Sequence, residues 1–564
     1  MRLKTYFFIL SAAFLISCTH SENRTIYPDR WVFVHDRAFT DDSQVEEVRE
    51  IVRTAAEHGL NGMVLSAGLD RLDLKPPDYF RRLEEVRNFC TQYGVEIVPL
   101  LFSVGYGYSV ILHDKNLCEG LPVKDALFVV SGKEARLVPD PTVGIVNGSF
   151  ENIESAGIPG FEYSGRPGEV LFADRTVFKD GKVSLRFENL GAYPEKSNRV
   201  SQEVSVRPYR LYRLSCWVRT EALEPSGSFS LEVYGGDRRI NFFDPQMPPT
   251  NEWQKLVLGF NTWGYDKVVI SAGAAGAKKG KFWVDGLSLE EVGLANILRR
   301  PGTPLVVRSE KDGTVYEEGQ DYTSVADPEM DFRFEHDGPP IQLLAGSRIK
   351  NGERLRVSWY HGFMAVQRKG QITVCMSEPE LYEIWRTQAR LIHKYLAPKK
   401  YFLDMDEIRA GGTCQACRDR HMTMGQILGD CITRQAGLLR EVNPEAEVFI
   451  WSDMLEPCHN AGDTWGKYFY LVDGLFTGSW NYVPKDIVMV SWWNEIMAQS
   501  LAHLSSQGFR ILASSSGDLD LQVTRDWLKA LDKTPRVVGI MYTTWQKKYD
   551  LLPAFGDLVS QPRK

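Results

Sequence analysis

Three carboxylates gather where a short apolar run ends. The stretch YFLDMDEIRAGGTC, residues 401–414, places Asp404, Asp406 and Glu407 between an aromatic start and two glycines. Like charges held close together cost free energy unless a neighbour neutralises them or a reaction uses them. Two neighbouring carboxylates with separated pKa values can serve as proton donor and anion in acid–base chemistry. The alternative is a solvated loop start in which Glu407 pairs with Arg409.

Polar and aromatic residues also close other apolar runs of the chain. They are His35 and Asp36 in RWVFVHDRAF, Trp451 and Asp453 in EVFIWSDML, Trp492, Trp493 and Asn494 in DIVMVSWWNE, and Trp545 in RVVGIMYTTWQ. Indole faces commonly hold the apolar faces of sugar rings. Asp453 suits a hydroxyl ligand, a second catalytic carboxylate or a helix cap, and His35 and Asp36 suit either substrate ligands or hydrogen-bond partners. Since side chains alternate along a strand, only one of Trp492 and Trp493 is expected to meet a ligand.

The elements that position these residues alternate between strand and helix patterns. RWVFVHDRAF, NGMVLSA and VEIVPLLFSV are buried strands, separated by a helix that Ser43 caps and a helix over residues 78–93. A helix capped by Ser377 leads into the carboxylate stretch, and EVFIWSDML, DIVMVSWWNE, FRILASSSG and RVVGIMYTTWQ follow. Eight such strands predict an α/β fold, a (β/α)8 TIM barrel whose chemistry lies where the strands end.

The alternation stops after the third strand. From about residue 120 to residue 352, short alternating runs are separated by Gly, Pro, Asn and Asp, which predicts antiparallel β-structure. We expect residues 24–118 and 355–564 to form the two parts of the barrel. Between them, we expect a β linker at residues 119–145, an all-β jelly-roll insertion at residues 146–293 and a small β segment at residues 294–354.

The order of these features resembles the catalytic domain of family 20 glycoside hydrolases, the β-N-acetylhexosaminidases. In both, an Asp-Glu pair closes the fourth strand and tryptophans close the fifth, sixth and eighth. The stretches FLDMDEIRAGGTC, WSDMLEPCHNA and GSWNY also resemble a group of secreted bacterial proteins related to that family. The resemblance implies an enzyme that hydrolyses O-glycosyl bonds in a glycan or oligosaccharide.

The resemblance also implies roles for single residues. Asp406 would orient the 2-acetamido group of the substrate and Glu407 would be the general acid, so that the acetamide itself acts as nucleophile. Arg30 would match the family's sugar-binding arginine on the first strand. The whole expected substrate-binding set is Arg30, His35, Asp36, Asp404, Trp451, Asp453, Trp492, Trp493, Asn494 and Trp545. The chain departs from the family where FLDM replaces His-x-Gly-Gly before Asp-Glu, and where no Pro-Gly-His follows the third strand.

The insertion resembles the jelly-roll modules of carbohydrate-binding families 4 and 9. VNGSFENI, VSLRFENL, YRLSCWVRT, EWQKLVLGF and KFWVDGLSLEEV carry this likeness over about residues 146–292. The resemblance implies either glycan binding through exposed aromatic residues such as Trp263 or Tyr234, or a module that only braces the barrel.

The N-terminal stretch MRLKTYFFILSAAFLISC predicts export. Arg2 and Lys4 precede an apolar run that is too short to span a bilayer, which is typical of a signal peptide. The ending Leu-Ile-Ser-Cys resembles a bacterial lipobox, so residues 1–18 are expected to be a lipoprotein signal with Cys18 as the lipidated residue. The expected location is the bacterial cell envelope, periplasmic or at the cell surface, with a lipid anchor as the only membrane contact. The alternative is an ordinary cleaved secretion signal.

Composition excludes some partners. The 564 residues carry a net charge of −7 and no concentrated basic face, which argues against a nucleic acid partner. Of nine cysteines, Cys414 and Cys417 form a C-x-x-C pair with Cys431 and Cys458 nearby in sequence. The uneven gaps match no zinc finger or ribbon, so we expect disulfides or buried thiols, no metal and no cofactor.

The expected function is that of an exo-acting β-N-acetylhexosaminidase-like hydrolase with a substrate-assisted retaining mechanism. One alternative is a hydrolase of other sugar specificity that uses a conventional carboxylate pair, Glu407 with Asp453 or Glu495. The other is a non-catalytic surface glycan-binding protein, which we would expect if Asp406 and Glu407 pointed away from the tryptophans.

Overall fold

The computed structural model describes residues 27–153, 157–164, 166–192, 197–365, 371–462 and 471–562. The expected signal peptide and its Cys18 lie outside these residues. Within them, no helix combines the length and the apolar character that crossing a membrane requires.

Eight parallel strands close into a barrel, as expected. Their order around the barrel is β1-β2-β3-β20-β22-β24-β25-β26, so the insertion interrupts the barrel after its third strand. The strands are β1 (Asp29–Val34), β2 (Gly62–Leu65), β3 (Glu96–Leu101), β20 (Lys400–Leu403), β22 (Glu447–Trp451), β24 (Val488–Ser491), β25 (Arg510–Ser516) and β26 (Val537–Thr543). Large side chains that include Trp31, Phe33, Phe402 and Phe449 pack together inside the barrel.

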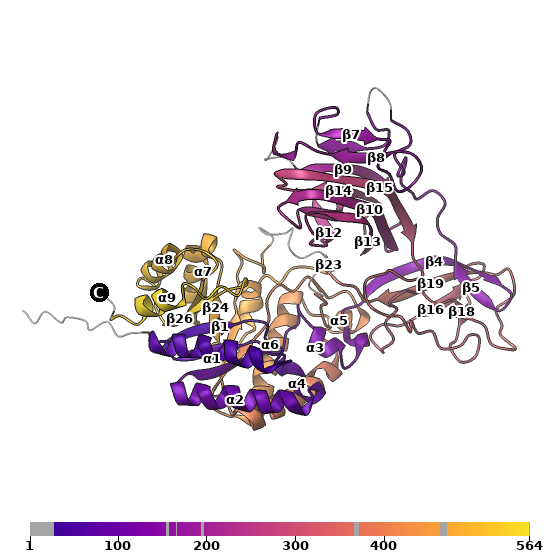
Figure 1. The fold of residues 1–564 in the computed structure, drawn as a ribbon. Helices are drawn as coiled ribbons and strands as arrows, with labels where there is room; N and C mark the ends of the chain where they lie inside the picture. The colour runs from indigo at the N-terminus through magenta and orange to yellow at the C-terminus, as the bar shows by residue number, and fades with distance from the viewer. Residues whose placement is uncertain are drawn as a thin grey trace, which may run out of the picture.

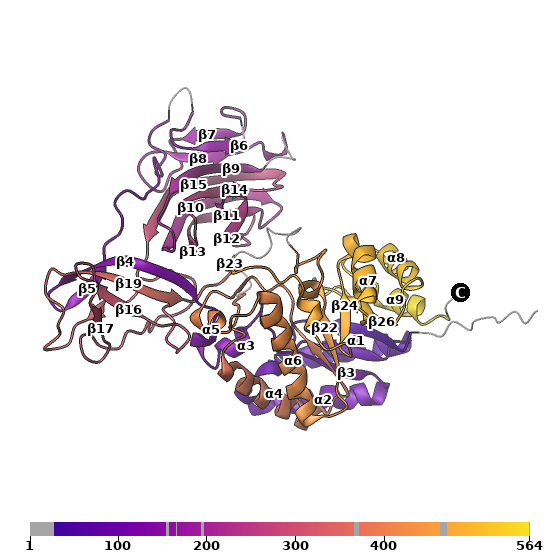
Figure 2. The same cartoon turned by 180° about the vertical axis from the view of Figure 1, so that it is seen from behind.

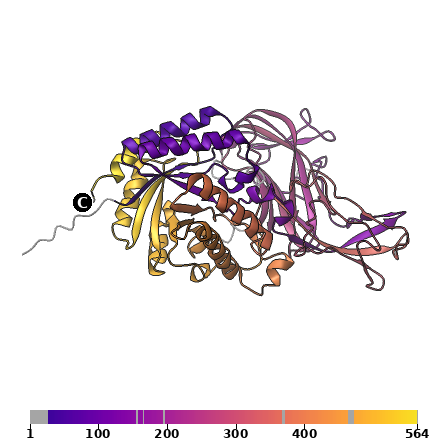
Figure 3. The same cartoon turned by 90° about the horizontal axis from the view of Figure 1, so that it is seen from below.

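Helices lie outside the barrel strands (Figures 1 and 3). They are α1 (Asp42–Glu57), α2 (Pro77–Tyr93), α4 (Pro379–Leu396), α6 (Met424–Val442), α7 (Met497–Ser506), α8 (Leu521–Leu531) and α9 (Leu552–Val559). Two expected caps are wrong by one or two residues. Asp41 caps α1, because its carboxylate accepts from the Gln44 amide, whereas Ser43 lies inside the first turn. Likewise, Glu378 and not Ser377 precedes α4.

The insertion contains a sandwich of two five-stranded antiparallel sheets. One sheet has the order β13-β10-β15-β8-β7 and the other the order β12-β11-β14-β9-β6. The strands are β6 (Glu162–Ser164), β7 (Leu171–Asp174), β8 (Ser184–Phe187), β9 (Asn198–Ser205), β10 (Leu211–Glu224), β11 (Phe229–Gly235), β12 (Arg238–Phe243), β13 (Asn251–Asn261), β14 (Lys267–Ala274) and β15 (Lys279–Glu291). Figures 1 and 2 show this sandwich standing apart from the barrel helices.

The two β segments that flank the sandwich in sequence meet in one six-stranded sheet. Its order is β17-β16-β19-β4-β5-β18. The strands are β4 (Leu121–Ser131), β5 (Glu134–Leu137), β16 (Val306–Ser309), β17 (Val315–Tyr316), β18 (Ile341–Gln342) and β19 (Arg354–His361). β19 was expected in the barrel, since the second part of the barrel was placed at residue 355. It pairs instead with β4, and the chain re-enters the barrel at α4.

The sandwich packs against this sheet through a shared apolar core. Asn261, at the end of β13, is fully buried and donates to the carbonyl of Pro122 over 3.0 Å. Its amide also lies 3.0 Å from the ring of His361. The six-stranded sheet therefore lies between the sandwich and the barrel along the chain and joins the two.

Candidate active site at the carboxyl end of the barrel

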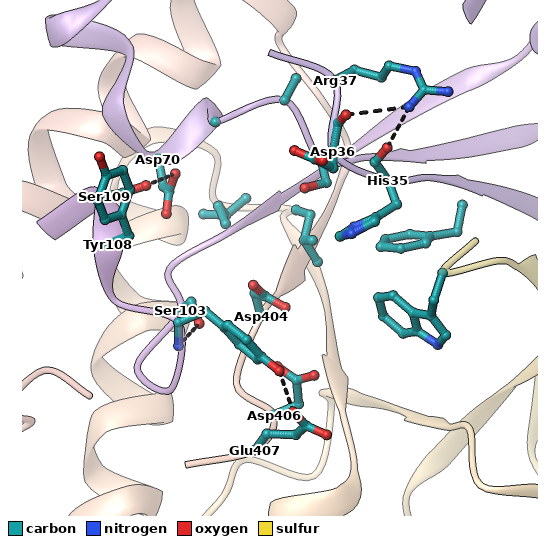
Figure 4. A pocket seen from close by; sticks show the side chains of 18 of the residues that line it. His35, Asp36, Arg37, Asp70, Ser103, Tyr108, Ser109, Asp404, Asp406 and Glu407 are labelled. Atoms are coloured by element: carbon teal, nitrogen blue, oxygen red, sulfur yellow. Dashed lines mark hydrogen bonds between the residues drawn. The ribbon is translucent and has the colours of Figure 1, made fainter. Parts of the chain in front are cut away.

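A cavity of about 730 Å³ opens where several barrel strands end. Eight of the expected residues line it: His35, Asp36, Asp404, Asp406, Glu407, Trp492, Trp493 and Trp545. Among the lining residues that were not expected are Arg37, Asp70, Arg71, Ser103, Tyr106, Tyr108 and Ser109. In Figure 4 the acidic group of residues 404–407 lies across the cavity from the segment of residues 35–37. Carboxylates, arginines and indoles therefore face one enclosed space.

The acidic loop begins where β20 ends. The strand ends at Leu403, and the Asp404 amide makes a last barrel contact with the Leu101 carbonyl at 2.9 Å. Glu407 has a φ of +51°, in the left-handed region, which turns the chain sharply after Asp406. Both Asp404 and Asp406 follow the strand, so the alternation of side chains along a strand does not orient them.

The Glu407 side chain is held by two neighbours. One carboxylate oxygen accepts a hydrogen bond from the Tyr106 hydroxyl and lies 3.3 Å from the Arg409 guanidinium. Gln371 links Glu407 to Arg409. Its side-chain NH2 group donates to the Glu407 carbonyl over 3.0 Å, and its side-chain oxygen accepts from the Arg409 guanidinium. The ion pair that we considered as an alternative is present. Glu407 nevertheless lines the cavity with about a fifth of its side chain exposed.

Two aspartates of the acidic loop have raised pKa values. Burial, followed by the charge of Asp70, raises the pKa of Asp404 to about 7. Burial, together with Asp404, Asp453 and Glu407, raises the pKa of Asp406 well above its usual range. We had expected Asp406 to stay ionised as the anion that positions an acetamide. The structure differs because Asp406 is almost fully buried among three other carboxylates, a setting that disfavours a further charge.

Asp453 lies behind the acidic loop and does not line the cavity. It is fully buried, and one carboxylate oxygen accepts from the Glu407 amide at 3.0 Å and from the Asn460 side chain at 2.8 Å. Burial raises the pKa of Asp453 to about 6. The short 3-10 helix η5 (Asp453–Leu455) has Ser452 at its N-cap, so Asp453 is no helix cap. Its contacts make it a positioning residue for Glu407.

Three indoles form the aromatic side of the cavity. Trp492 and Trp493 both line it, because β24 ends at Ser491 and strand alternation no longer separates them. Behind them His459 contacts both rings, with centroids 4.7 and 5.5 Å away. Trp545 is about half exposed and meets the His35 ring edge-on at 5.3 Å. Both Trp492 and Trp493 thus line the cavity, and the expectation that only one of them meets a ligand stays a prediction.

Three other expected residues lie away from the cavity. Arg30 is near the amino end of β1, opposite the mouth, and its guanidinium donates to the Gly59 and Tyr27 carbonyls. Trp451 is 1% exposed and packs inside the barrel between Phe33 and Phe402. The side chain of Asn494 accepts a hydrogen bond from the Trp527 indole instead. All three residues belong to a barrel strand or to its end. Their position along the strand, or the direction of the side chain, keeps them out of the cavity lining.

The polar lining residues that sequence reasoning missed follow the first three barrel strands, and Arg37 follows β1. Asp70 and Arg71 lie in the 3-10 helix η1 (Leu69–Leu74) after β2, and Ser109 donates to Asp70 over 2.6 Å. Tyr106 and Ser109 follow β3. The rule that chemistry lies where barrel strands end applied equally to these segments, and it was the one signal that could have found them.

The aromatic residues considered in the jelly roll form no exposed platform. Trp263 is partly buried against the Tyr209 ring at 5.9 Å. Tyr234 is also partly buried, and its hydroxyl donates to Glu232. Glycan binding by these two residues stays a prediction.

Comparisons with known proteins add little to this geometry. No family model and no curated protein matches the chain. Among solved structures, a β-N-acetylhexosaminidase shares 12% identity over 34% of this chain and 44% of its own, with a TM-score of 0.27. The GH20 exo β-N-acetylglucosaminidase of Vibrio harveyi shares 16% identity over 34% of this chain and 33% of its own, with a TM-score of 0.25. The carbohydrate-binding module TmCBM61 shares 17% identity over 26% of this chain and 95% of its own, with a TM-score of 0.21. Both expected kinds of neighbour occur, but scores this low carry no argument about function.

Proposed function

We propose that the chain is a glycoside hydrolase built on a (β/α)8 TIM barrel and acting at this cavity. One observation carries the proposal: three acidic residues and three tryptophans, Asp404, Asp406, Glu407, Trp492, Trp493 and Trp545, line the same enclosed space. Hydrolysis of a glycosidic bond needs carboxyl groups beside the bond, and indoles provide stacking surfaces for sugar rings. The volume, about 730 Å³, is in the range of sites that enclose small ligands.

The proposed reaction is exo-acting and resembles that of a β-N-acetylhexosaminidase. Glu407 donates its proton to the leaving glycosidic oxygen while the acetamide oxygen of the same sugar bonds to the anomeric carbon. Water then opens the cyclic intermediate and restores the proton to Glu407, so that the configuration at the anomeric carbon is retained. Asp406 accepts from the acetamide N–H. The adjacency of Asp406 and Glu407 on one cavity wall supports this division of roles.

A specific observation favours a second mechanism at the same site. Glu407 is paired with Arg409, whereas burial raises the pKa of Asp404 to about 7 and that of Asp406 well above its usual range. This arrangement suits a conventional pair in which an aspartate is the acid and Glu407 the anionic nucleophile. The partners first considered for Glu407 fit less well, because Glu495 is exposed outside the cavity and Asp453 lies behind the loop.

The geometry argues against a purely glycan-binding protein. That alternative would be favoured if Asp406 and Glu407 pointed away from the tryptophans. Both residues instead line the same cavity as Trp492, Trp493 and Trp545.

A panel of chromogenic glycosides with and without 2-acetamido groups tests the proposal. Substrate assistance predicts cleavage of 2-acetamido sugars and strong inhibition by a thiazoline that mimics the cyclic intermediate. Preference for free 2-hydroxyl sugars and indifference to the thiazoline would select the two-carboxylate mechanism. No cleavage of any glycoside, natural glycans included, would reject both mechanisms.

We also propose that the enzyme is exported and anchored in the bacterial envelope through lipid on Cys18. A single acyl chain holds a protein only marginally at a membrane, whereas several chains hold it firmly. Cys18→Ser should therefore move the protein from the membrane fraction to the soluble fraction. A variant that stays as membrane-bound as the wild type would contradict the anchor.

A further inference from the structure

Four buried side chains from three separate segments meet beside the barrel. They are Glu119, Cys375, Cys414 and Cys417, and one ligand atom from each lies within 4.8 Å of every other. The Cys375 sulfur lies 3.4 Å from that of Cys414 and 3.6 Å from that of Cys417. The Cys417 sulfur lies 3.7 Å from Oε2 of Glu119. The exposed fraction of each residue is at most 3%.

We propose that these four side chains bind a structural Zn²⁺ ion. A tetrahedral ion with Zn–S bonds of about 2.3 Å separates its sulfur ligands by about 3.8 Å, close to the spacings observed here. Three thiolates and one carboxylate complete the four-coordinate shell that is typical of structural zinc sites. Because protein atoms supply all four ligands, the proposed ion has no open position for water or substrate.

The groups around the cluster orient its ligands as a metal site requires. Oε1 of Glu119 accepts from the Thr413 amide at 2.9 Å, the Thr413 hydroxyl at 2.8 Å and the Cys414 amide at 3.1 Å. These bonds leave Oε2 to face the sulfurs. The Ser377 hydroxyl donates to the Cys417 sulfur over 3.2 Å. Hydrogen-bonded neighbours of this kind fix ligand orientation in metal sites.

A buried cation compensates the negative charge of the proposed ligands. Arg300 is 5% exposed at its side chain, and its guanidinium lies 3.9 Å from the Cys414 sulfur. It is held there by the carbonyls of Asn116 and Cys118 and by Glu378. Three thiolates and a carboxylate outweigh the charge of one Zn²⁺, and a nearby guanidinium reduces the cost of burying that excess.

A disulfide explains the cluster less well. Bonded sulfurs are about 2.05 Å apart, and a single disulfide would leave the third thiol and Glu119 without a role. All eight cysteines in the described part of the chain are free thiols. Sequence reasoning grouped the C-x-x-C pair with Cys431 and Cys458, but Cys431 lies in α6 and Cys458 lies near Glu456 and Ser500. The spacing argument against zinc considered only cysteines that are near one another in sequence, whereas Glu119 and Cys375 come from distant parts of the chain.

The placement of the ligands suggests what the ion stabilises. Glu119 lies just before β4, where the chain leaves the barrel for the insertion, and Cys375 lies where it returns to α4. Cys414 and Cys417 belong to the start of α5 (Gln415–Arg418), which ends the segment that begins with the acidic loop. Figures 1 and 2 show α5 at the junction of the barrel and the six-stranded sheet. One ion would therefore connect the two chain segments that join the barrel to the insertion, and would hold both of them to the segment that begins with the acidic loop.

Elemental analysis of the purified full chain tests the proposal. The protein is prepared without a polyhistidine tag or chelator, and we expect one zinc ion per chain. A mercurial thiol reagent should release that zinc, as read by a colorimetric indicator. Exchange with Co²⁺ should produce thiolate-to-cobalt charge-transfer bands and the intense visible bands of a tetrahedral site. The cobalt spectrum of the wild type tests the ligand set even where variants fail to fold.

Variants then identify the ligands. Cys375→Ser and Cys414→Ser should lower the zinc content about ten-fold or more, and Glu119→Gln should shift the cobalt bands. Cys216→Ser is the matched control, because Cys216 is fully buried in β10, outside the cluster, and should leave the zinc content unchanged. The proposal is overturned if the wild type holds no zinc and gives no tetrahedral cobalt spectrum. A chain mass lower by two hydrogens, showing a disulfide within the cluster, would overturn it equally.

Discussion

Glu407 occupies a backbone conformation that an ordinary residue adopts only at a cost. A non-glycine residue in the left-handed region is disfavoured by roughly 1–3 kcal/mol, and Glu407 has a φ of +51°. Its amide donates to Asp453, its carbonyl accepts from Gln371 and its carboxylate contacts Tyr106 and Arg409. Contacts at all three polar groups of one residue hold it in this conformation, with its carboxylate in the cavity.

Glu407→Gln tests the role of this carboxylate. Loss of a general acid typically lowers the rate by about 10² to 10⁴, so the variant should lose that much activity on a natural glycan. Aryl glycosides with activated leaving groups need little protonation and should suffer much less. Glu495→Gln, at an exposed residue outside the cavity, is the matched control and should retain activity. Full activity of Glu407→Gln on a natural glycan would remove Glu407 from catalysis. Equal loss on both substrate types would favour the nucleophile role.

Asp404 should make stability depend on pH. An aspartate in an unfolded chain has a pKa of about 3.9, whereas burial raises the pKa of Asp404 to about 7. Between these values the folded chain binds the additional proton, so the free energy of unfolding falls as pH rises. Asp404→Asn should remove the part of this fall that Asp404 causes. The difference in the free energy of unfolding between about pH 4 and about pH 8 should therefore shrink by roughly 4 kcal/mol, since each pKa unit corresponds to about 1.4 kcal/mol.

Chemical denaturation across this pH range measures the Asp404 effect. Asp78→Asn, at an exposed position of α2, is the control, and its curve should run parallel to that of the wild type. An Asp404→Asn curve that also runs parallel to the wild type would show that Asp404 does not titrate differently in the folded state.

At the scale of elements, a residue that follows one barrel strand holds the backbone of a residue that follows the neighbouring strand. Asp453 follows β22 and holds the amide of Glu407, which follows the neighbouring β20. A buried donor that loses its acceptor costs about 1–3 kcal/mol. Asp453→Ala should therefore lower the free energy of unfolding by about that amount.

The same variant should also lower kcat more than it raises KM, because the carboxylate of Glu407 moves. Asp453→Asn keeps an oxygen acceptor and should restore most of both properties. Thermal unfolding and steady-state kinetics of the two variants make the comparison. Equal damage in both variants would indicate that the charge of Asp453, and not its acceptor, is what matters.

The sequence predicts that the barrel strands exist, but it does not predict which of their residues lie inside the barrel and which lie at its mouth. The buried runs around Val32, Val64, Val98 and Phe402 became barrel strands, since continuous apolar stretches suit strands buried on both faces. Trp451 was misplaced because one residue decides whether a side chain lies inside the barrel or at its mouth. A sequence pattern locates a strand to within a few residues, which is coarser than this difference.

Contacts between distant segments were also beyond the sequence. The pairing of β4 with β19 joins residues more than two hundred positions apart, and neither strand carries a mark of its partner. Glu119 precedes β4 and Cys375 follows β19, so the same pairing of distant segments brings them to Cys414 and Cys417. The direction of the Asp406 pKa shift was also beyond the sequence, because burial is its largest cause, followed by the carboxylates of Asp404 and Asp453.

The whole molecule has separate apolar cores for barrel and insertion. The insertion core extends through both sheets of the sandwich and the six-stranded sheet, and it also includes Ala410 and Leu471 from the barrel segments. These two residues pair in a small parallel sheet, β21 (Ala410–Gly411) with β23 (Leu471–Val472). The segment that follows Glu407 thus packs on the insertion, so changes in the insertion should reach the acidic loop.

The natural unit of the insertion is longer than the jelly roll that the sequence suggested. Leu121 and His361 are cross-strand partners in β4 and β19, so a fragment of residues 121–361 begins and ends at one point, as inserted domains do. A fragment of residues 141–293 lacks the six-stranded sheet. It exposes Asn261 and the apolar face around it, which are buried in the whole protein.

We therefore expect residues 121–361 to fold alone with a single cooperative thermal transition. Residues 141–293 should unfold at a Tm roughly 10 °C lower, since a loss of a few kcal/mol shifts Tm by about 2–4 °C per kcal/mol in a domain of this size. Asn261→Ala in the longer fragment is the matched variant and should account for part of the difference, because it removes the hydrogen bond to Pro122. Equal Tm values for the two fragments would show that the sandwich is independent of the sheet. A longer fragment that stays unfolded would show that the insertion needs the barrel, and with it the junction that carries Glu119 and Cys375.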